Sequence, residues 1–251
     1  MSDFRNGYSM PAAADMSADA GLRSFMLGVY NKVALGLLVS AALAWVTGSY
    51  EPVRELMFNT AVFPDGVTRL TGYTMLGMIV AFSPLVILLG SNFVMKNPTA
   101  ASAGGLYWLI VALIGASMGT VVLLYTGTSV IQTFLITAAA FGALSLFGYT
   151  TKKDLTGIGS FLIMGVIGLI IASVVNMFLQ NNMMQMIISA AGVLIFAGLT
   201  AYDTQRLKMT YYALGGNQNA MGVATSYGAL SLYINFINMF QFLLALFGGR
   251  R

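Results

Sequence analysis

The sequence predicts an all-α fold: a polytopic membrane protein whose seven transmembrane helices form a single bundle. Of the 251 residues, 58% are hydrophobic and only 8% are charged. A soluble domain carries roughly 25% charged residues, so this surface cannot face mostly water. The charged residues also divide the chain into apolar stretches of about 20 residues, the length that crosses a bilayer as a helix. Helices are the expected element because a backbone in lipid must satisfy its own hydrogen bonds.

The amino-terminal stretch is polar and precedes the first apolar run. It carries Asp3, Asp15 and Asp19 and lacks the basic-then-apolar pattern of a cleaved signal peptide. We therefore expect residues 1–26 to form a flexible polar cytosolic tail. Residues 27–251 are expected to form one transmembrane domain.

Gaps between charged residues define the spans. One charge-free gap lies between residues 32 and 51, and a second between residues 69 and 96. The gaps from 96 to 152 and from 154 to 203 each hold two helices, divided by a polar turn. The predicted spans are 27–48, 70–91, 104–125, 129–149, 158–179, 184–204 and 226–247.

Lysine and arginine predict the orientation. With the amino terminus in the cytosol, the cytosolic segments collect eight of these residues and the outside segments collect four. The positive-inside rule then places the amino terminus in the cytosol and the carboxyl terminus outside. The net charge of +4 is spread along the chain, without the basic stripe of a nucleic-acid-binding protein, so no nucleic-acid partner is predicted.

Cysteine and histidine are absent from the chain. Disulfides and a Cys/His zinc site are thereby excluded, and with them a zinc-dependent intramembrane protease. A retinal-binding protein is excluded because no lysine occurs from 209 to 249. No nucleophile with a base is evident, so no enzyme activity and no cofactor are predicted. Any pH response near neutrality must come from a carboxyl group with a shifted pKa.

Asp203 is the one acidic residue of the sequence that falls within a predicted span. One interpretation pairs it with Arg206, one turn later, among the lipid headgroups. The other buries it, because Tyr211 and Tyr212 resemble an interfacial aromatic belt about 12 Å further along the helix. On that interpretation Arg206 and Lys208 extend outward to the membrane surface. Both interpretations remain open at this point.

The last predicted span carries polar residues on one face. Ser231, Asn235 and Asn238 recur at i, i+4 and i+7, so they share one side of the helix. Hydrocarbon cannot satisfy their polar groups, and this face is therefore expected to point into the bundle. The same pattern fits a transport path or simple hydrogen bonding between helices.

Two further patterns predict packing. Gly115 and Gly119 form a GxxxG spacing, which is typical of close contact between two membrane helices. Ser173 and Asn176 form a weaker polar stripe in the fifth predicted span. We interpret this stripe as a packing feature.

Two segments together resemble the Bax inhibitor family in its bacterial branch. They are AGLTAYDTQ at 197–205 and GALSLYINFINMF at 228–240. The resemblance covers nearly the whole chain. It implies six helices around a central seventh, a bacterial inner (plasma) membrane location, a pH-sensitive calcium leak and protection from cell death. Other bacterial relatives restrain a membrane-bound, ATP-dependent quality-control protease.

The resemblance also assigns roles to residues. In the best-understood bacterial type, an aspartate of the sixth span shares a proton with one of the seventh. These positions fall on Asp203 and on Asn235, which is not an acid. A second-span arginine that holds the closed state in that type has no counterpart, since no Arg or Lys occurs in 70–95. The expected proton-sensing and ion-path residues are Asp203, Asn235, Asn238 and Ser231.

Two functions are thus expected, with different partners. The first is a cation leak in the lipid bilayer, for calcium or another cation, with Asp203 as the candidate cation contact and no defined metal-ligand set. The alternative is a non-conducting membrane interaction protein that modulates a membrane-bound quality-control protease.

Overall fold

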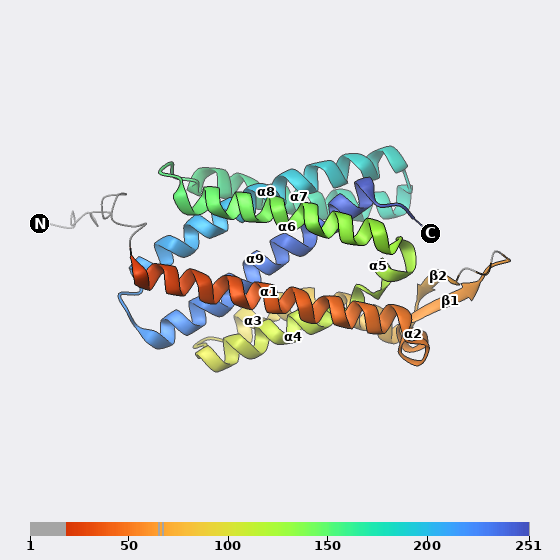
Figure 1. Cartoon of the computed structure of the whole chain (residues 1–251), viewed down its shortest axis with the longest axis horizontal. Helices are drawn as coiled ribbons and strands as arrows, with labels where there is room; N and C mark the ends of the chain where they lie inside the picture. Colours follow the sequence, from red (N-terminus) through yellow and green to blue (C-terminus); the bar gives the residue numbers. More distant parts are fainter. Residues whose placement is uncertain (1–18, 65, 67, 251) are drawn as a thin grey trace, which may run out of the picture.

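The computed structural model describes residues 19–64, 66 and 68–250, without the side chains of 92–94. Over this part of the chain nine helices and one short hairpin are present (Figure 1). In chain order they are α1 (Ala20–Ser49), α2 (Glu51–Met57), β1 (Phe58–Val62), β2 (Thr68–Tyr73), α3 (Met75–Val94), α4 (Ala100–Ser117), α5 (Gly119–Leu124), α6 (Gly127–Thr150), α7 (Thr156–Leu179), α8 (Asn182–Ala213) and α9 (Gln218–Phe247).

Six of the described helical segments are long and apolar enough to cross a membrane. They are α1, α4 together with α5, α6, α7, α8 and α9. Helix α3 is a shorter apolar helix of 20 residues. The predicted all-α membrane fold is confirmed at this level, whereas α3 falls short of the length that the other six reach.

The second predicted span, 70–91, begins too early. Its first residues belong to β2, which pairs antiparallel with β1. Helix α3 begins only after Thr74, whose hydroxyl accepts a hydrogen bond from the Gly77 amide. Thr and Tyr favour strands, and counting uncharged residues between two charges does not register that preference. The connection between α1 and α3 is therefore a short helix and a hairpin rather than a simple loop.

Helix α1 begins earlier than predicted. Of the predicted tail, residues 1–18 lie outside the described part of the chain. Asp19 is the N-cap, and its carboxylate accepts hydrogen bonds from the amides of Gly21 and Leu22 at 2.8 and 3.1 Å. A carboxylate at this position satisfies amides that lack a partner within the helix. The residues from Ala20 to position 26 are consequently helical.

Helix α9 lies at the centre of the bundle. It packs against α1, α4, α6 and α8, while α7 lies outside on α8 and α3 lies outside on α4 (Figure 1). Its core residues Leu232 and Tyr233 are fully buried. Phe236 contacts Phe134 and Phe141 of α6 with ring centroids 5.4 Å apart in each pair. The last helix, α9, thus has the central place that the resemblance implied, and four helices contact it directly.

The GxxxG glycines lie where predicted, in a close helix contact. A Cβ atom on Gly115 would lie 2.6 Å from the Ser40 Cα atom of α1, and one on Gly119 would collide with Thr47. Thr47 also donates to the Ala116 carbonyl at 2.9 Å. Without side chains at these two positions, α1 can approach α4 and α5 closely enough to bond across the interface.

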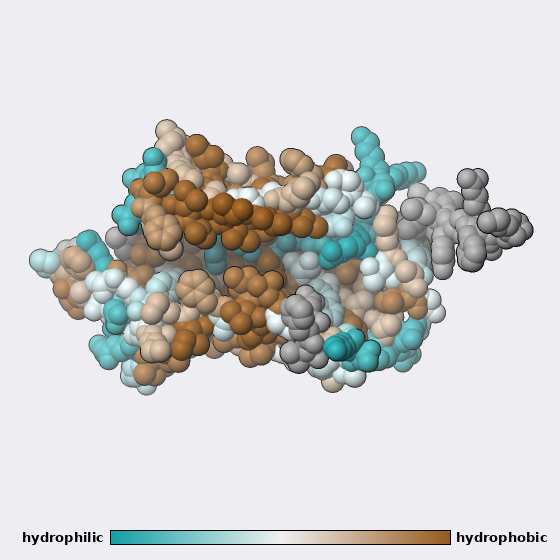
Figure 2. All heavy atoms as spheres, turned by 180° about the vertical axis from the view of Figure 1, so that it is seen from behind, coloured by the Kyte–Doolittle hydropathy of each residue, from teal (hydrophilic) through white to brown (hydrophobic). Residues whose placement is uncertain are grey.

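The surface has the polarity of a bilayer-spanning bundle. Figure 2 shows hydrophobic side chains over the middle of the far face and hydrophilic side chains gathered toward its two ends. Large apolar residues such as Leu38, Phe161 and Leu194 are 67%, 69% and 73% exposed. Exposure on this scale is stable only against lipid.

A first prediction concerns the glycine contact. Replacing Gly115 by Leu should destabilise the folded protein by about 1 to 3 kcal/mol, because the side chain forces α4 away from α1. Thermal unfolding in detergent measures the change. The matched control is Gly105→Leu on the same helix, where an added Cβ has no atom within 4 Å. Equal midpoints for the two variants would contradict the close-contact interpretation.

A second prediction concerns orientation. Because the chain has no native cysteine, single cysteines report cleanly. Cysteines in place of Gly127 and Asn182 should react with a membrane-impermeant maleimide from outside the cell. A cysteine in place of Gln218 should react only after the cytosolic face is opened. All three positions are exposed helix starts. Reversed labelling would show that the carboxyl terminus is cytosolic.

Candidate functional site

The candidate site lies between α8 and α9, which a tight turn sets antiparallel. Gly215 and Gly216 have φ angles of +54° and +84°, a left-handed conformation that glycine adopts without strain. Asn217 then caps α9 by accepting a hydrogen bond from the Ala220 amide at 3.1 Å. The two helices pack along their lengths, so polar residues on their facing sides meet inside the bundle.

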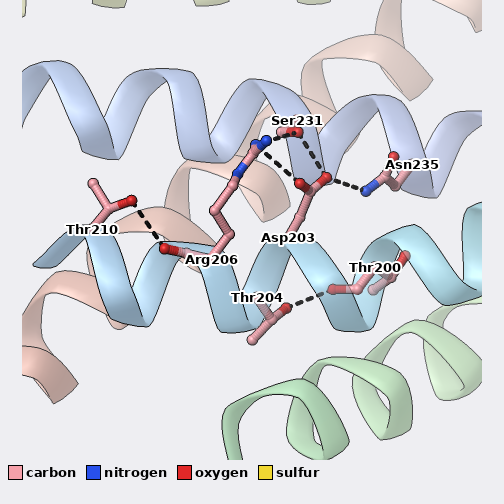
Figure 3. A network of polar contacts seen from close by, with 7 residues as sticks. All are labelled: Thr200, Asp203, Thr204, Arg206, Thr210, Ser231 and Asn235. Carbon is pink, nitrogen blue, oxygen red and sulfur yellow. Dashed lines mark hydrogen bonds and ion pairs between the residues drawn. The ribbon is translucent and has the colours of Figure 1, made fainter. Parts of the chain in front are cut away.

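Asp203 of α8 meets the polar face of α9. Its Oδ2 atom accepts one hydrogen bond from the Ser231 hydroxyl and one from the Asn235 amide, both at 2.8 Å (Figure 3). The residue is only 4% exposed. A buried carboxylate is strongly unfavourable unless it is hydrogen-bonded, and these two donors provide that compensation. The predicted contact between Asp203 and the last span is therefore present.

Arg206 binds the other oxygen of the same carboxylate. Its guanidinium lies 2.9 Å from Oδ1 of Asp203 and 3.4 Å from the Ser231 hydroxyl (Figure 3). It also lies over the ring of Tyr202, 5.6 Å from the centroid. Each of the two interpretations of Asp203 is therefore met in part: the residue is paired with Arg206, and it is buried. Arg206 carries the charge that balances a carboxylate which α9 binds with neutral donors.

The expected outward extension of Arg206 and Lys208 is wrong. Arg206 turns back toward Asp203, although its side chain is 48% exposed. Lys208 is buried and donates to the Tyr149 carbonyl at 2.8 Å. Carbonyls in the last turn of a helix lack partners within it, and α6 ends at Thr150, so a lysine donor satisfies one of them. Both cations therefore bind acceptors within the protein instead of extending to the membrane surface.

Asn238 does not join the site. Its amide donates to the Ile234 carbonyl of its own helix at 2.8 Å. Around the helix axis, Asn235 is rotated by about 40° from Ser231, and Asn238 is rotated by about 60° in the opposite direction from Asn235. Asn238 also lies one turn further along the helix, away from Asp203. Of the four predicted site residues, the structure brings together Asp203, Ser231 and Asn235.

A second polar contact on α9 escaped the sequence reasoning. Lys32 of α1 donates to the Ser226 hydroxyl at 2.7 Å, and the Tyr107 hydroxyl donates to the Lys32 carbonyl. Further along, the hydroxyls of Ser40 and Tyr233 lie 2.6 Å apart. Lys32 marked the edge of a charge-free gap in the sequence and so was not considered as an internal group. Its position inside the first predicted span was the available signal.

Of the weaker stripe in α7, only Asn176 has the packing role that we expected. The Asn176 amide donates to Gln185 at 3.1 Å, and its oxygen accepts from the Asn181 amide at 3.1 Å. Ser173 is exposed. These contacts fix the turn between α7 and α8.

The site offers one carboxylate and no metal cage. Within residues 19–64, 66 and 68–250, no group of three His, Cys, Asp or Glu side chains could hold a metal ion. Outside the spans, hydrogen bonds from the hydroxyl and amide of Thr156 lower the pKa of Asp154, so this loop acid stays ionised near neutral pH. The site thus presents one carboxylate, Asp203, and both of its oxygens are paired within the bundle.

Comparison with known proteins agrees with the motif resemblance. The family described as "Inhibitor of apoptosis-promoting Bax1" matches residues 22–251. An uncharacterized protein of Caulobacter vibrioides is 64% identical over the full length of both chains. The inner membrane protein YbhL of Escherichia coli is 38% identical over 92% of this chain and 94% of its own. A Rickettsia prowazekii protein, RP147, is 41% identical over 93% and 92% respectively.

The hydrogen bond between α8 and α9 predicts an energetic coupling. In a double-mutant cycle, Asp203→Asn and Asn235→Ala should couple by about 1 to 2 kcal/mol, because the bond involves a buried charge. Unfolding by denaturing detergent gives the four stabilities. Asn238→Ala is the matched control, since its amide bonds within its own helix, and it should show no coupling to Asp203→Asn. Coupling of equal size for both asparagines would contradict the assignment.

Proposed function

The chain belongs to the Bax inhibitor-1 family of membrane proteins, and we propose that it is a pH-responsive cation leak whose path passes Asp203. Calcium is the first ion to test. A cytoprotective role would follow from control of cation entry. We place the protein in a bacterial inner membrane, as the name of the relative YbhL supports, with a cytosolic amino terminus and an outside carboxyl terminus.

One observation carries this proposal: a carboxylate is buried where the central helix meets α8. Asp203 lies ten residues before the end of α8, about 15 Å along the helix axis. Acids at such depth are unfavourable and are typical of ion or proton pathways. With a single carboxylate, the site suits brief contact with a cation in passage rather than retention of a resident ion.

The geometry corresponds to a closed site. Both carboxylate oxygens are occupied, Oδ1 by Arg206 and Oδ2 by Ser231 and Asn235. Arg206 comes from the same helix and supplies the cation that related proteins take from the second span. We propose that this ion pair is the latch of the closed state, because a cation cannot reach Asp203 until Arg206 moves away.

Protonation provides the link to pH. The ionised carboxylate accepts from a guanidinium, a hydroxyl and an amide, whereas the neutral acid loses its charge attraction to Arg206. The Arg206 side chain is half exposed, so it can leave the site at little cost in desolvation. On this proposal, binding of a proton at Asp203 releases Arg206, the latch, and weakens the charge-assisted hydrogen bonds from Ser231 and Asn235 of α9.

A second candidate function rests on α7. This helix packs along α8 and presents a long apolar face outward, including Phe161, Met177 and Phe178 at 69%, 65% and 77% exposure. Such a face could bind a transmembrane helix of another protein. A non-conducting interaction protein that modulates a membrane-bound quality-control protease would use this surface rather than the Asp203 site.

The decisive variant places a second acid beside the first. Asn235→Asp should produce a calcium flux into liposomes that changes steeply between about pH 6 and 8, whereas the parent varies less. Two carboxyl groups in hydrogen-bond contact cannot both ionise without a large electrostatic penalty, so one takes up a proton. Asn238→Asp adds the same acid to the same helix away from Asp203. It should behave like the parent.

The outcome separates the two candidate functions. Identical impermeability of the parent, Asn235→Asp and Asn238→Asp at every pH would refute the leak. Cross-linking from α7 in native membranes would then test the interaction protein. Equal gains in Asn235→Asp and Asn238→Asp would show that any added charge opens the bundle and that Asp203 has no special role.

A further inference from the structure

A groove lies between α1 and α6, away from the Asp203 site. Its volume is about 610 Å³, within the range of small-ligand sites. The two helices run antiparallel here, with the start of α1 beside the end of α6 (Figure 1). The lining residues are Arg23, Met26, Leu27, Tyr30, Phe141, Gly142, Ser145, Leu146 and Tyr149.

The groove opens on the outer surface of the bundle. Leu27 and Leu146 on its two walls are 51% and 63% exposed, as expected for residues that face lipid. Phe141 in its wall is buried and belongs to the aromatic cluster around α9. From Phe141 to Tyr149 the groove follows α6 for about 12 Å. A narrow, apolar, laterally open groove of this length suits part of a hydrocarbon chain.

Polar groups gather at one end of the groove. Arg23 lies in the first turn of α1, and Tyr149 lies in the last turn of α6, so both mark the same end of the bundle. Among the described residues the Arg23 guanidinium makes no salt bridge or side-chain hydrogen bond, and the residue is exposed. Lys152 and Lys153 follow α6 at this end. The groove is thus apolar along its length and cationic at its mouth.

Ser145 adds an unsatisfied donor inside the groove. Its hydroxyl is buried, the residue being 5% exposed, and it has no hydrogen-bond partner in the described part of the chain. Serine in a helix commonly donates to a carbonyl of its own helix, as Thr150 does here. A buried polar group without a partner indicates a missing acceptor. Ser145 lies one turn deeper than Tyr149, below the cationic mouth.

We propose that this groove binds a phospholipid, with one acyl chain along α1 and α6 and its phosphate on Arg23. A rotation about χ1 turns the Ser145 hydroxyl, whose oxygen is buried in the groove wall, toward an ester carbonyl just below the phosphate. Arg23 supplies the fork of donors that phosphate oxygens accept. The site does not depend on whether the protein conducts ions, because it shares no residue with the Asp203 contact.

The groove can be filled without disturbing the fold. An added Cβ on Gly142 would have no atom within 4 Å, and the same holds for Gly168 on the lipid-facing side of α7. Gly142→Phe therefore places a ring in the groove, and Gly168→Phe adds the same ring elsewhere. Arg23→Gln removes the cation at the mouth, and Lys96→Gln removes one from the exposed loop between α3 and α4.

Native mass spectrometry of the full chain in detergent tests the site. Three probes are titrated: phosphatidylglycerol, diacylglycerol with the same chains, and glycerol 3-phosphate. The parent should bind phosphatidylglycerol about tenfold more tightly than diacylglycerol, and glycerol 3-phosphate should not bind measurably. Gly142→Phe should abolish specific lipid binding, and Arg23→Gln should lower phosphatidylglycerol to the diacylglycerol level. Gly168→Phe and Lys96→Gln should match the parent.

Three results would overturn the proposal. If Gly142→Phe binds phosphatidylglycerol as the parent does, the acyl chain does not occupy the groove. If Arg23→Gln and Lys96→Gln weaken binding equally, the phosphate has no defined contact and the lipid associates through general surface charge. Tight binding of glycerol 3-phosphate alone would assign the mouth to a soluble phosphate compound instead of a lipid.

Discussion

The buried carboxylate of Asp203 joins α8 and α9, the two helices that pack most extensively against each other. The arrangement of the bundle follows from that contact. Hydrocarbon offers Asp203 no hydrogen-bond donor, so α9 must present Ser231 and Asn235 to it. These two bonds fix the rotation of α9 relative to α8. Once this rotation is set, the opposite faces of α9 bring aromatic residues to α6 and Tyr233 to α1. The polar contact thus specifies a position that apolar packing alone would leave less defined.

Asp203 and Asn235 are complementary as hydrogen-bond acceptor and donor. A carboxylate only accepts hydrogen bonds when ionised, and the amide of Asn235 donates one without needing a proton from solution. An aspartate at position 235 would have to be protonated to play the same part. Arg206 balances the remaining charge from the same helix. The combination pairs both carboxylate oxygens without a second acid and without a cation in α3.

Most of the fold could be predicted because the bilayer interior excludes charged residues, so each charge in the sequence limits where a span can lie. Charge-free gaps located the helices, and the Gly115 spacing indicated a close contact that the structure contains. The end of β2 was missed because it lies inside the uncharged gap from 69 to 96, which was assigned whole to a helix. At the site, the spacing of Ser231 and Asn235 predicted their shared face. The ion pair of Arg206 with Asp203 is local, and the sequence offered it as one of two interpretations. The inward turn of Lys208 depends on the Tyr149 carbonyl, 59 residues away, and no local pattern reveals it.

The central claim is that Asp203 holds α8 and α9 together. The most direct measurement is the distance distribution between spin labels at Met186 on α8 and Gln241 on α9, recorded by pulsed electron paramagnetic resonance in lipid nanodiscs. Both positions are exposed, and the chain has no competing cysteine. The account predicts one narrow distribution for the parent and an added, longer component for Asp203→Ala, with Asn238→Ala unchanged. Identical distributions for the parent and Asp203→Ala would contradict it.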